Sequence, residues 1–324
     1  MTDYAAILAE RFPVRKTKAQ KQAFREWLTE ELKALGCEPR EETNGHLRAR
    51  SILVGDPEHS AVLFVCHYDT PPRWILPDLW FPRNLLLWSL VQLLHMLLLL
   101  LPALAVYLSL WRLTGGNAQI GLWGLVLTYL GMLALNQFGP ANRTNRGEDA
   151  DVAAMLDLLA SLPEEDRAKA AWLFADQGCR GGNGARAWGK ANPLAAYTRL
   201  TVAFARLGGG DHLLAAGTRL AAKCTGWGAL AGALSATDGL KTTVTGARFC
   251  TVRGDRRAFR CGVSLTGCKY SRLADFWANG GRTPADSAAD METVGAVCEA
   301  LKRFLGQLTL YQNGKKKRTA RREG

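Results

Sequence analysis

The apolar positions of this chain fall into two repeating patterns. Lys18–Leu35 places apolar residues at the three- and four-residue spacing of an amphipathic helix, which Gly36 ends. The residues that form this stripe are Phe24, Trp27, Leu28, Leu32 and Leu35. Short apolar runs follow at Leu47–Val54 and Ala61–Cys66, separated by turn-forming residues, and they predict two strands.

The same alternation of strands and helices continues through the second half of the chain. Further strands are predicted at Ala170–Ala175, Leu200–Ala205, His212–Ala216, Ala247–Val252 and Phe259–Thr266, and helices at Asp151–Leu162, Ala185–Ala191, Thr218–Leu234 and Met291–Leu308. Strands that alternate with helices favour an α/β fold, in which helices flank both faces of a mixed central sheet.

A long apolar segment interrupts this pattern. Asn84–Trp111 and Leu113–Asn142 carry no charged residue, and only Arg112 separates them. A hydrocarbon core of roughly 30 Å needs about 20 helical residues, so each run is long enough to cross a membrane. We therefore predict a transmembrane hairpin inserted into the α/β domain. The alternative is a buried helical hairpin in a soluble core.

The insertion divides the chain into consecutive parts. Residues 1–80 and 141–310 form the two parts of the α/β domain, residues 81–140 form the hairpin, and residues 311–324 form a basic tail. Arg73, Arg83, Arg143 and Arg146 flank the hairpin, whereas its loop holds only Arg112. The positive-inside rule then places the folded domain on the cytoplasmic side of the cell membrane.

Charge and cysteine content add two constraints. The 324 residues carry a formal net charge of +12, part of it in the tail at Lys315–Arg318, Arg321 and Arg322. No aromatic residues interleave with these charges and no nucleic-acid-binding motif occurs, so we expect no nucleic-acid partner. The tail is interpreted as solvated and disordered, or as contacting anionic lipid. The 8 cysteines are scattered without a CxxC pair, as is typical of reduced thiols.

Candidate chemistry begins where the strand Ala61–Cys66 ends, at His67, Tyr68 and Asp69. Alternate residues of an extended chain point to one face, so His67 and Asp69 lie together, while Cys66 points to the core. In open α/β sheets, binding sites lie at the carboxyl ends of the strands. A histidine here can bind a metal while the aspartate orients a neighbouring group.

Strand-His67-Tyr68-Asp69 resembles the His-x-Asp element of the co-catalytic di-zinc aminopeptidases, whose relatives include aminopeptidase Y, glutamate carboxypeptidase and the glutaminyl cyclases. The resemblance continues in the family's order over most of the chain outside the hairpin and tail. Asn142–Leu159 is similar to the Asn-Asp-Asn-x-Ser-Gly segment and its helix, and Ala171–Trp188 to the strand, Glu-Glu pair and glycine-rich turn. Val202–His212 is similar to the strand with a metal-binding aspartate, and Arg282–Ser287 to the terminal His-Thr-x-x-Asp-Thr turn.

The resemblance implies two zinc ions that share a bridging carboxylate, with a free glutamate as general base. His67 matches the first zinc ligand and Asp69 the aspartate that orients it. The remaining family positions hold residues that cannot take these roles. The bridging aspartate falls at about Gly147, the general base and next ligand at Gln177 and Gly178, the aspartate ligand at Ala205, and the last histidine at Arg282.

Nearby acids offer weak substitutes for the missing ligands. Asp149, Asp151 and Asp176 could join His67 and Asp69 in a loose single-metal cluster, and Glu148 is also close in sequence. A zinc site needs three or four well-placed ligands, so we expect zinc to be absent or weakly bound. We also predict that Arg282 pairs with Asp69 or Asp176, as a salt bridge in place of a metal.

Two other motifs carry little chemistry. Gly184–Ala191 nearly fits a phosphate-binding loop, but it ends in alanine where a magnesium-binding Ser or Thr belongs, and it predicts a helix. Gly178–Gly184 is a glycine-rich turn whose backbone N–H groups could hold an anion, and a plain tight turn is the favoured interpretation.

The leading hypothesis is therefore a membrane-anchored homologue of zinc aminopeptidases that has lost most metal ligands. Such a pseudoenzyme would act in binding or regulation, holding a peptide or pairing with an active paralogue. The first alternative is an active aminopeptidase with a rearranged or single-metal site. The second is a basic adaptor at the membrane surface that uses the fold as a scaffold.

Overall fold

The computed structural model describes residues 2–320 except 75, 77, 247–249 and 251–254. It confirms the predicted fold class, a mixed sheet between two layers of helices. The order of hydrogen-bonded strands is β1-β2-β5-β3-β6-β9-β10-β4, and β7 pairs with both β8 and β9. These strands are β1 (Pro39–Asn44), β2 (Ala49–Val54), β3 (Val62–His67), β4 (Leu79–Trp80), β5 (Ala170–Ala175), β6 (Leu200–Phe204), β7 (His212–Gly217), β8 (Lys241–Gly246), β9 (Gly262–Ser271) and β10 (Asp275–Asn279).

The centre of the sheet is parallel. Strand β3 pairs in parallel with β5 on one side and with β6 on the other, and β6 pairs in parallel with β9. Strand β3 is completely buried, because helices cover both of its faces, and this explains its continuous apolar sequence. The parallel arrangement brings the carboxyl-terminal ends of β3, β5 and β6 to one edge of the sheet.

Alternate residues of β3 enter different cores, as the two-residue period of a strand requires. Val62, Phe64 and Cys66 belong to the larger core, where helices α1 (Tyr4–Arg11), α2 (Lys18–Ala34), α5 (Arg146–Ser161), α9 (Trp227–Ser235) and α10 (Met291–Ala320) contribute buried side chains. Leu63 and Val65 belong to the smaller core on the other face, which α7 (Asn183–Ala191) and α8 (Pro193–Thr198) cover. Cys66 is thus a core residue, as predicted.

Most predicted elements occur within a few residues of their expected ends, but three predictions need correction and a fourth is largely untested. Helix α5 begins at Arg146, five residues before the expected start, so its first turn reaches the candidate site. The helix expected at Thr218–Leu234 is broken: a short turn ends at Lys223, and α9 starts after Gly226, whose φ of +108° interrupts a helix. Helix α10 continues to Ala320, where the sequence predicts a disordered tail. The strand expected at Ala247–Val252 lies largely outside the described residues, and β8 precedes it.

The remaining elements were not predicted because their apolar signal is weak. Helix α1 has only two buried residues, and β1 is a polar edge strand with no buried residue. The four-residue helix α6 (Glu164–Arg167) is likewise polar. Strands β4 and β10 are short and pair with each other. Strand β4 pairs with a strand far away in sequence, which local patterns do not reveal, and β10 also forms a hairpin with β9.

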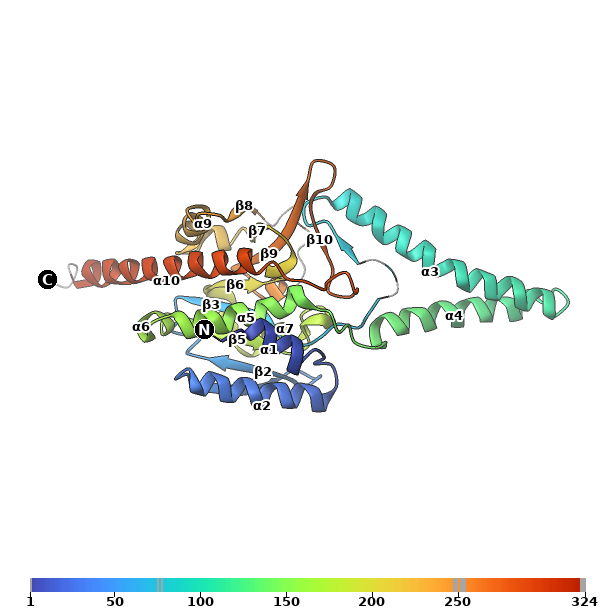
Figure 1. Cartoon of the computed structure of the whole chain (residues 1–324), viewed down its shortest axis with the longest axis horizontal. Coiled ribbons are helices and arrows are strands. Elements are labelled where there is room, and N and C mark those ends of the chain that lie inside the picture. Colours follow the sequence, from blue (N-terminus) through green and yellow to red (C-terminus); the bar gives the residue numbers. More distant parts are fainter. Residues whose placement is uncertain (1, 75, 77, 247–249, 251–254, 321–324) are drawn as a thin grey trace.

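The inserted hairpin projects away from the α/β domain (Figure 1). It consists of α3 (Leu85–Leu113) and α4 (Ala118–Phe138), both long and apolar enough to cross a membrane. Only 17% and 6% of their most apolar windows are buried, so the alternative of a hairpin buried in a soluble core is wrong. Exposed apolar surface of this extent is typical of contact with lipid or with another protein.

Candidate functional site

The candidate site lies at the edge where β3, β5 and β6 end. His67 is the last residue of β3, Asp176–Cys179 follow β5, and Ala205 and Arg206 follow β6. The first turn of α5 adds Glu148 from a segment beyond the hairpin. This is the position at which parallel sheets generally hold ligands.

His67 is the centre of the cluster. Its Nδ1 lies 3.1 Å from Oδ2 of Asp255, and its Nε2 lies 3.6 Å from Oε2 of Glu148. A ligand atom of His67, one of Glu148 and Sγ of Cys179 all lie within 4.8 Å of one another. Burial disfavours the imidazolium, but Asp255 and Cys179 together outweigh it and raise the pKa of His67 well above its usual value.

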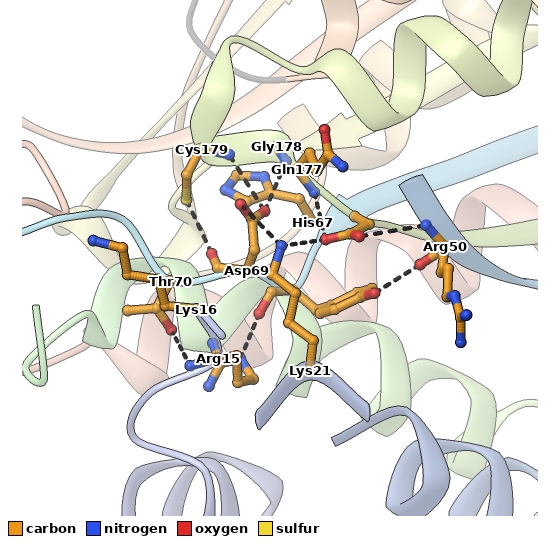
Figure 2. Close-up of polar contacts among 12 residues, drawn as sticks. Arg15, Lys16, Lys21, Arg50, His67, Asp69, Thr70, Gln177, Gly178 and Cys179 are labelled. Atoms are coloured by element: carbon orange, nitrogen blue, oxygen red, sulfur yellow. Dashed lines mark hydrogen bonds and ion pairs between the residues drawn. The ribbon is translucent and has the colours of Figure 1, made fainter. Parts of the chain in front are cut away.

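The turn after β5 approaches His67 so closely that only glycine fits at position 178. A Cβ added to Gly178 would lie 2.1 Å from Cγ of His67. The turn also folds around Asp69, whose Oδ1 accepts hydrogen bonds from the backbone N–H groups of Gly178 and Cys179, at 2.7 and 3.3 Å. Figure 2 shows Asp69 beside His67, with dashed lines from its carboxylate to this turn. Two of the N–H groups of the turn Gly178–Gly184 that could hold an external anion are therefore occupied by Asp69.

Glu148 is held as a carboxylate between two cations. Its Oε2 faces His67, and its Oε1 lies 3.7 Å from Nη1 of Arg206. Burial alone would raise the pKa of Glu148, but His67 and Arg206 outweigh it and lower the pKa to about 2.

Arg206 lies in the interior of the site. It has the left-handed φ of +65° and follows Ala205, the position where the resemblance expects a metal-binding aspartate. Its backbone N–H and that of Leu207 donate to Asp151, each at 2.7 Å, and this fixes the turn. Its Nη2 lies 2.9 Å from Oδ1 of Asp286. The side chain is only 4% exposed, and its guanidinium nitrogens make ion pairs without a hydrogen bond of suitable geometry.

Lys21, from α2, is the cation beside the aspartates. Its Nζ lies 2.5 Å from Oδ1 of Asp176 and 3.9 Å from Oδ2 of Asp69; Figure 2 shows the lysine reaching this cluster. Arg282 instead donates from Nη2 to the carbonyl of Cys179 at 3.3 Å and lies over the ring of Trp74. The prediction that Arg282 pairs with Asp69 or Asp176 was wrong, because Lys21 takes that role.

The proposed substitute acids have other partners. Asp149 forms a buried ion pair with Arg15, Asp151 accepts from the turn after β6, and Asp176 pairs with Lys21. Gln177 donates from Nε2 to the carbonyl of Leu47 at 3.1 Å, and an amide has no basic oxygen for proton abstraction. Asp69 was predicted to orient His67, but Asp255 rather than Asp69 contacts Nδ1 of the imidazole. Glu148 lies beside Nε2 of His67 in place of the three predicted acids.

Sequence reasoning missed Cys179, Arg206, Asp255 and Lys21. Cys179 follows a strand in a glycine-rich turn, a position that indicates an exposed functional group. Lys21 belongs to a helix whose polar face gave no sign of a partner. Asp255 begins a short turn that precedes β9, and no local pattern connects it to His67, 188 residues away.

A cavity of about 320 Å³ opens onto this cluster. Its polar wall includes His67, Glu148 and Cys179, and three arginines, Arg206, Arg257 and Arg282, line it as well. Its apolar wall includes Trp74, Trp80 and Trp88. The size is within the range of small-molecule sites.

The residues present do not fit a two-zinc centre. Carboxylates are needed to balance the charge of two divalent ions, but Gly147, Gly178 and Ala205 offer no ligand atom, and Arg206 brings a fixed positive charge. A single ion has a better donor set. His67 Nε2 is buried without a hydrogen bond and lies near Glu148 and Cys179, all of which are zinc-ligand types.

Solved structures share this fold. A glutaminyl cyclase from Porphyromonas gingivalis is 14% identical with a TM-score of 0.58, and the match covers 94% of this chain and 98% of that one. A Zn-dependent exopeptidase from Parabacteroides distasonis is 13% identical with a TM-score of 0.58, covering 94% and 96%. The LapA aminopeptidase of Legionella pneumophila is 9% identical with a TM-score of 0.53, covering 94% and 70%.

These similarities establish the fold of the zinc-dependent exopeptidases and glutaminyl cyclases for this chain. No protein-family model matches the sequence, and no curated protein matches it. The fold agrees with the resemblance that the strand ending in His67 and Asp69 suggests.

Proposed function

We propose that this protein is a membrane-anchored binding protein of the zinc-exopeptidase fold, in which ion pairs replace the two-metal centre. The observation that carries this proposal is the guanidinium of Arg206, buried between Glu148 and Asp286. A two-metal centre at the same edge of the fold would need carboxylate ligands around its divalent ions.

The charges of the cluster support a stable arrangement without metal. Arg206 and the imidazolium of His67 face Glu148, Asp255 and Asp286 at ion-pair distance. A divalent ion beside Glu148 would be repelled by Arg206 and would have to displace a proton from His67. Lys21 neutralises Asp69 and Asp176 in the same way.

Metal analysis of the purified full chain tests this proposal. After dialysis against a chelator and back-titration with zinc, we expect far less than one zinc per chain and no hydrolysis of aminopeptidase substrates. About two zinc per chain, the stoichiometry of a co-catalytic site, together with activity that His67→Ala abolishes, would overturn it.

A second candidate is a single-metal centre, and Nε2 of His67, which is buried without a hydrogen bond, favours it. His67, Glu148 and Cys179 supply three protein ligands, the number found in catalytic zinc sites. Asp255 would orient the imidazole through Nδ1. When bound, the ion would polarise a carbonyl group or lower the pKa of a water molecule.

The two candidates differ in the metal content of matched variants. The single-metal candidate predicts about one zinc per chain, lost in Cys179→Ala and in Glu148→Gln. Cys37→Ala, at a free cysteine that is partly buried outside the cluster, should retain the metal. A wild-type protein that binds no zinc would exclude this candidate.

The apolar helices α3 and α4 support a membrane anchor of two spans, and we propose that the folded domain lies on the cytoplasmic side of the cell membrane. The arginines beside the domain end of the hairpin support this orientation. A peptide or an active paralogue is the partner that a pseudoenzyme role suggests, whereas the arginines and tryptophans that line the cavity favour a different ligand.

A further inference from the structure

Residues of the hairpin line the cavity of the candidate site. Trp88, in the first turn of α3, lines the same cavity as His67 and Glu148. Trp74 lines this cavity and also a second one of about 690 Å³, which Leu135 and Asn136 of α4 border. The polar cluster is therefore connected, through one tryptophan, to the domain ends of both apolar helices.

Trp74 is fixed in this shared wall. Its Nε1 donates to the carbonyl of Asn136 at 3.2 Å, and its ring meets that of His95 of α3 at a centroid distance of 6.0 Å. Its ring also contacts Arg282, whose Cζ lies 4.7 Å from the centroid. Tryptophan combines an apolar ring with a polar N–H group and is enriched at the membrane interface.

The polar end of the cavity has cationic donors available for a ligand. Among the described residues, no carboxylate lies within ion-pair distance of Arg282. The buried guanidinium of Arg206 makes ion pairs but no hydrogen bond of suitable geometry, and Arg257 adds a third positive charge. Asp78 and Glu148 are the acids of the lining. Planar guanidinium groups bind carboxylates and phosphates through paired hydrogen bonds.

We infer that the cavity binds an anionic, single-chain amphiphile from the membrane. Its carboxylate or phosphate head contacts Arg282 and Arg206, and its apolar chain runs past Trp74 and Trp88 toward the hairpin. The apolar walls lie at the domain ends of two exposed apolar helices. This position favours a ligand that comes from the membrane over a water-soluble peptide. This inference rests on the proposed binding role of the site.

Photo-crosslinking tests this inference on the full chain in phosphatidylcholine nanodiscs. The probes are palmitic acid with a diazirine near its carboxyl end, its methyl ester, and a lysophosphatidic acid with the same group. Labelled residues are mapped by mass spectrometry. We expect the anionic probes to label the segment 73–88 and the residues around Arg282. The anionic probe that labels the cavity more strongly identifies the head group that the cavity binds. The ester should label only exposed residues of α3 and α4.

Matched arginine variants make the test specific. We expect a several-fold loss of labelling at the cavity in Arg282→Gln and in the more exposed Arg257→Gln, which has little reason to affect folding. Arg112→Gln, at the opposite end of the hairpin, should label as the wild type does. Equal labelling in all variants, labelling confined to the outer faces of α3 and α4, or displacement by a soluble acidic peptide would overturn the inference.

Zinc measured on the same preparation separates the two proposals. A metal-free protein without cavity labelling contradicts the amphiphile alone. A protein with two zinc ions and cavity labelling contradicts the metal-free binding role alone.

Discussion

At the scale of single residues, the site depends on one buried cation. Arg206 holds the turn after β6 against α5, because its backbone donates to Asp151 while its side chain faces Glu148 and Asp286. Buried ion pairs are weak contributors to stability as a whole, but removing one partner leaves an uncompensated charge.

Arg206→Met should therefore lower the free energy of unfolding by about 3–5 kcal/mol. The double variant Arg206→Met with Asp286→Leu should regain part of this loss, because neither charge then remains unpaired. Denaturant unfolding in mild detergent measures both. Arg219→Met, at an exposed arginine, serves as the control and should change stability by less than about 0.5 kcal/mol. Additive effects of the two site substitutions would contradict the ion-pair interpretation.

Asp151 links stability to pH. Its complete burial outweighs the two backbone hydrogen bonds that it accepts and raises its pKa to about 7. Because this pKa lies above the unfolded value of 3.8, the folded state retains a proton that the unfolded chain has lost. The free energy of unfolding should then fall as the pH rises from about 4 to about 7.

Asp151→Asn should flatten this pH dependence, since an amide does not titrate. Unfolding temperatures measured between these pH values test the expectation, and Asp238→Asn, at an exposed aspartate, should leave the slope unchanged. A slope that persists in Asp151→Asn would assign the dependence to another group.

At the scale of elements, the close packing of the two hairpin helices depends on glycine. A Cβ added to Gly121 of α4 would lie 2.9 Å from the ring of Tyr107 and 3.1 Å from its carbonyl oxygen. Small residues of this kind let two apolar helices approach closely where no hydrophobic effect drives their association.

Gly121→Leu should therefore separate the helices and destabilise the hairpin by about 1–3 kcal/mol, the usual cost of overpacking. Gly131→Leu in the same helix is a matched control, because a Cβ there meets no atom within 4 Å. The fraction of protein that remains monodisperse after heating in detergent measures the difference. Equal thermal stability of the two variants would contradict close packing at Gly121.

At the scale of the whole molecule, the hairpin is an insertion between two segments that meet in the site. Pro72, on the N-terminal side of the hairpin, and Ala141, directly after it, form a β-bridge. Asn142 donates from Nδ2 to the carbonyls of Gly281 and Thr283, at 2.7 and 3.1 Å. The anchor thus joins the fold beside the cavity rather than at a distant terminus.

The proposed topology predicts which cysteines a membrane-impermeant maleimide reaches in intact cells. Thr114→Cys, in the hairpin loop, should be labelled from outside. Glu58→Cys and the native cysteines of the domain should be labelled only after the membrane is permeabilised. Labelling of Glu58→Cys in intact cells would place the folded domain on the outer side.

The sequence predicted those parts of the fold that have strong local patterns. Local patterns of apolar residues predict these elements without knowledge of their packing partners. They are the buried strand β3, the helices α2 and α10 and the apolar hairpin. The edge strand β1, the short pair β4 and β10, and the break at Gly226 have no such pattern. His67 and Asp69 were found because they directly follow a buried strand.

The sequence by itself determined the fold class and the apolar hairpin, because both depend on local patterns of apolar residues. Only the tertiary structure decided which charges fill the site. Arg206 faces Glu148, Lys21 rather than Arg282 lies beside Asp69, and Asp255 contacts His67, 188 residues away in sequence. Such contacts depend on which strand ends and turns lie close together in the folded chain. The spacing of residues along the sequence does not reveal these long-range neighbours.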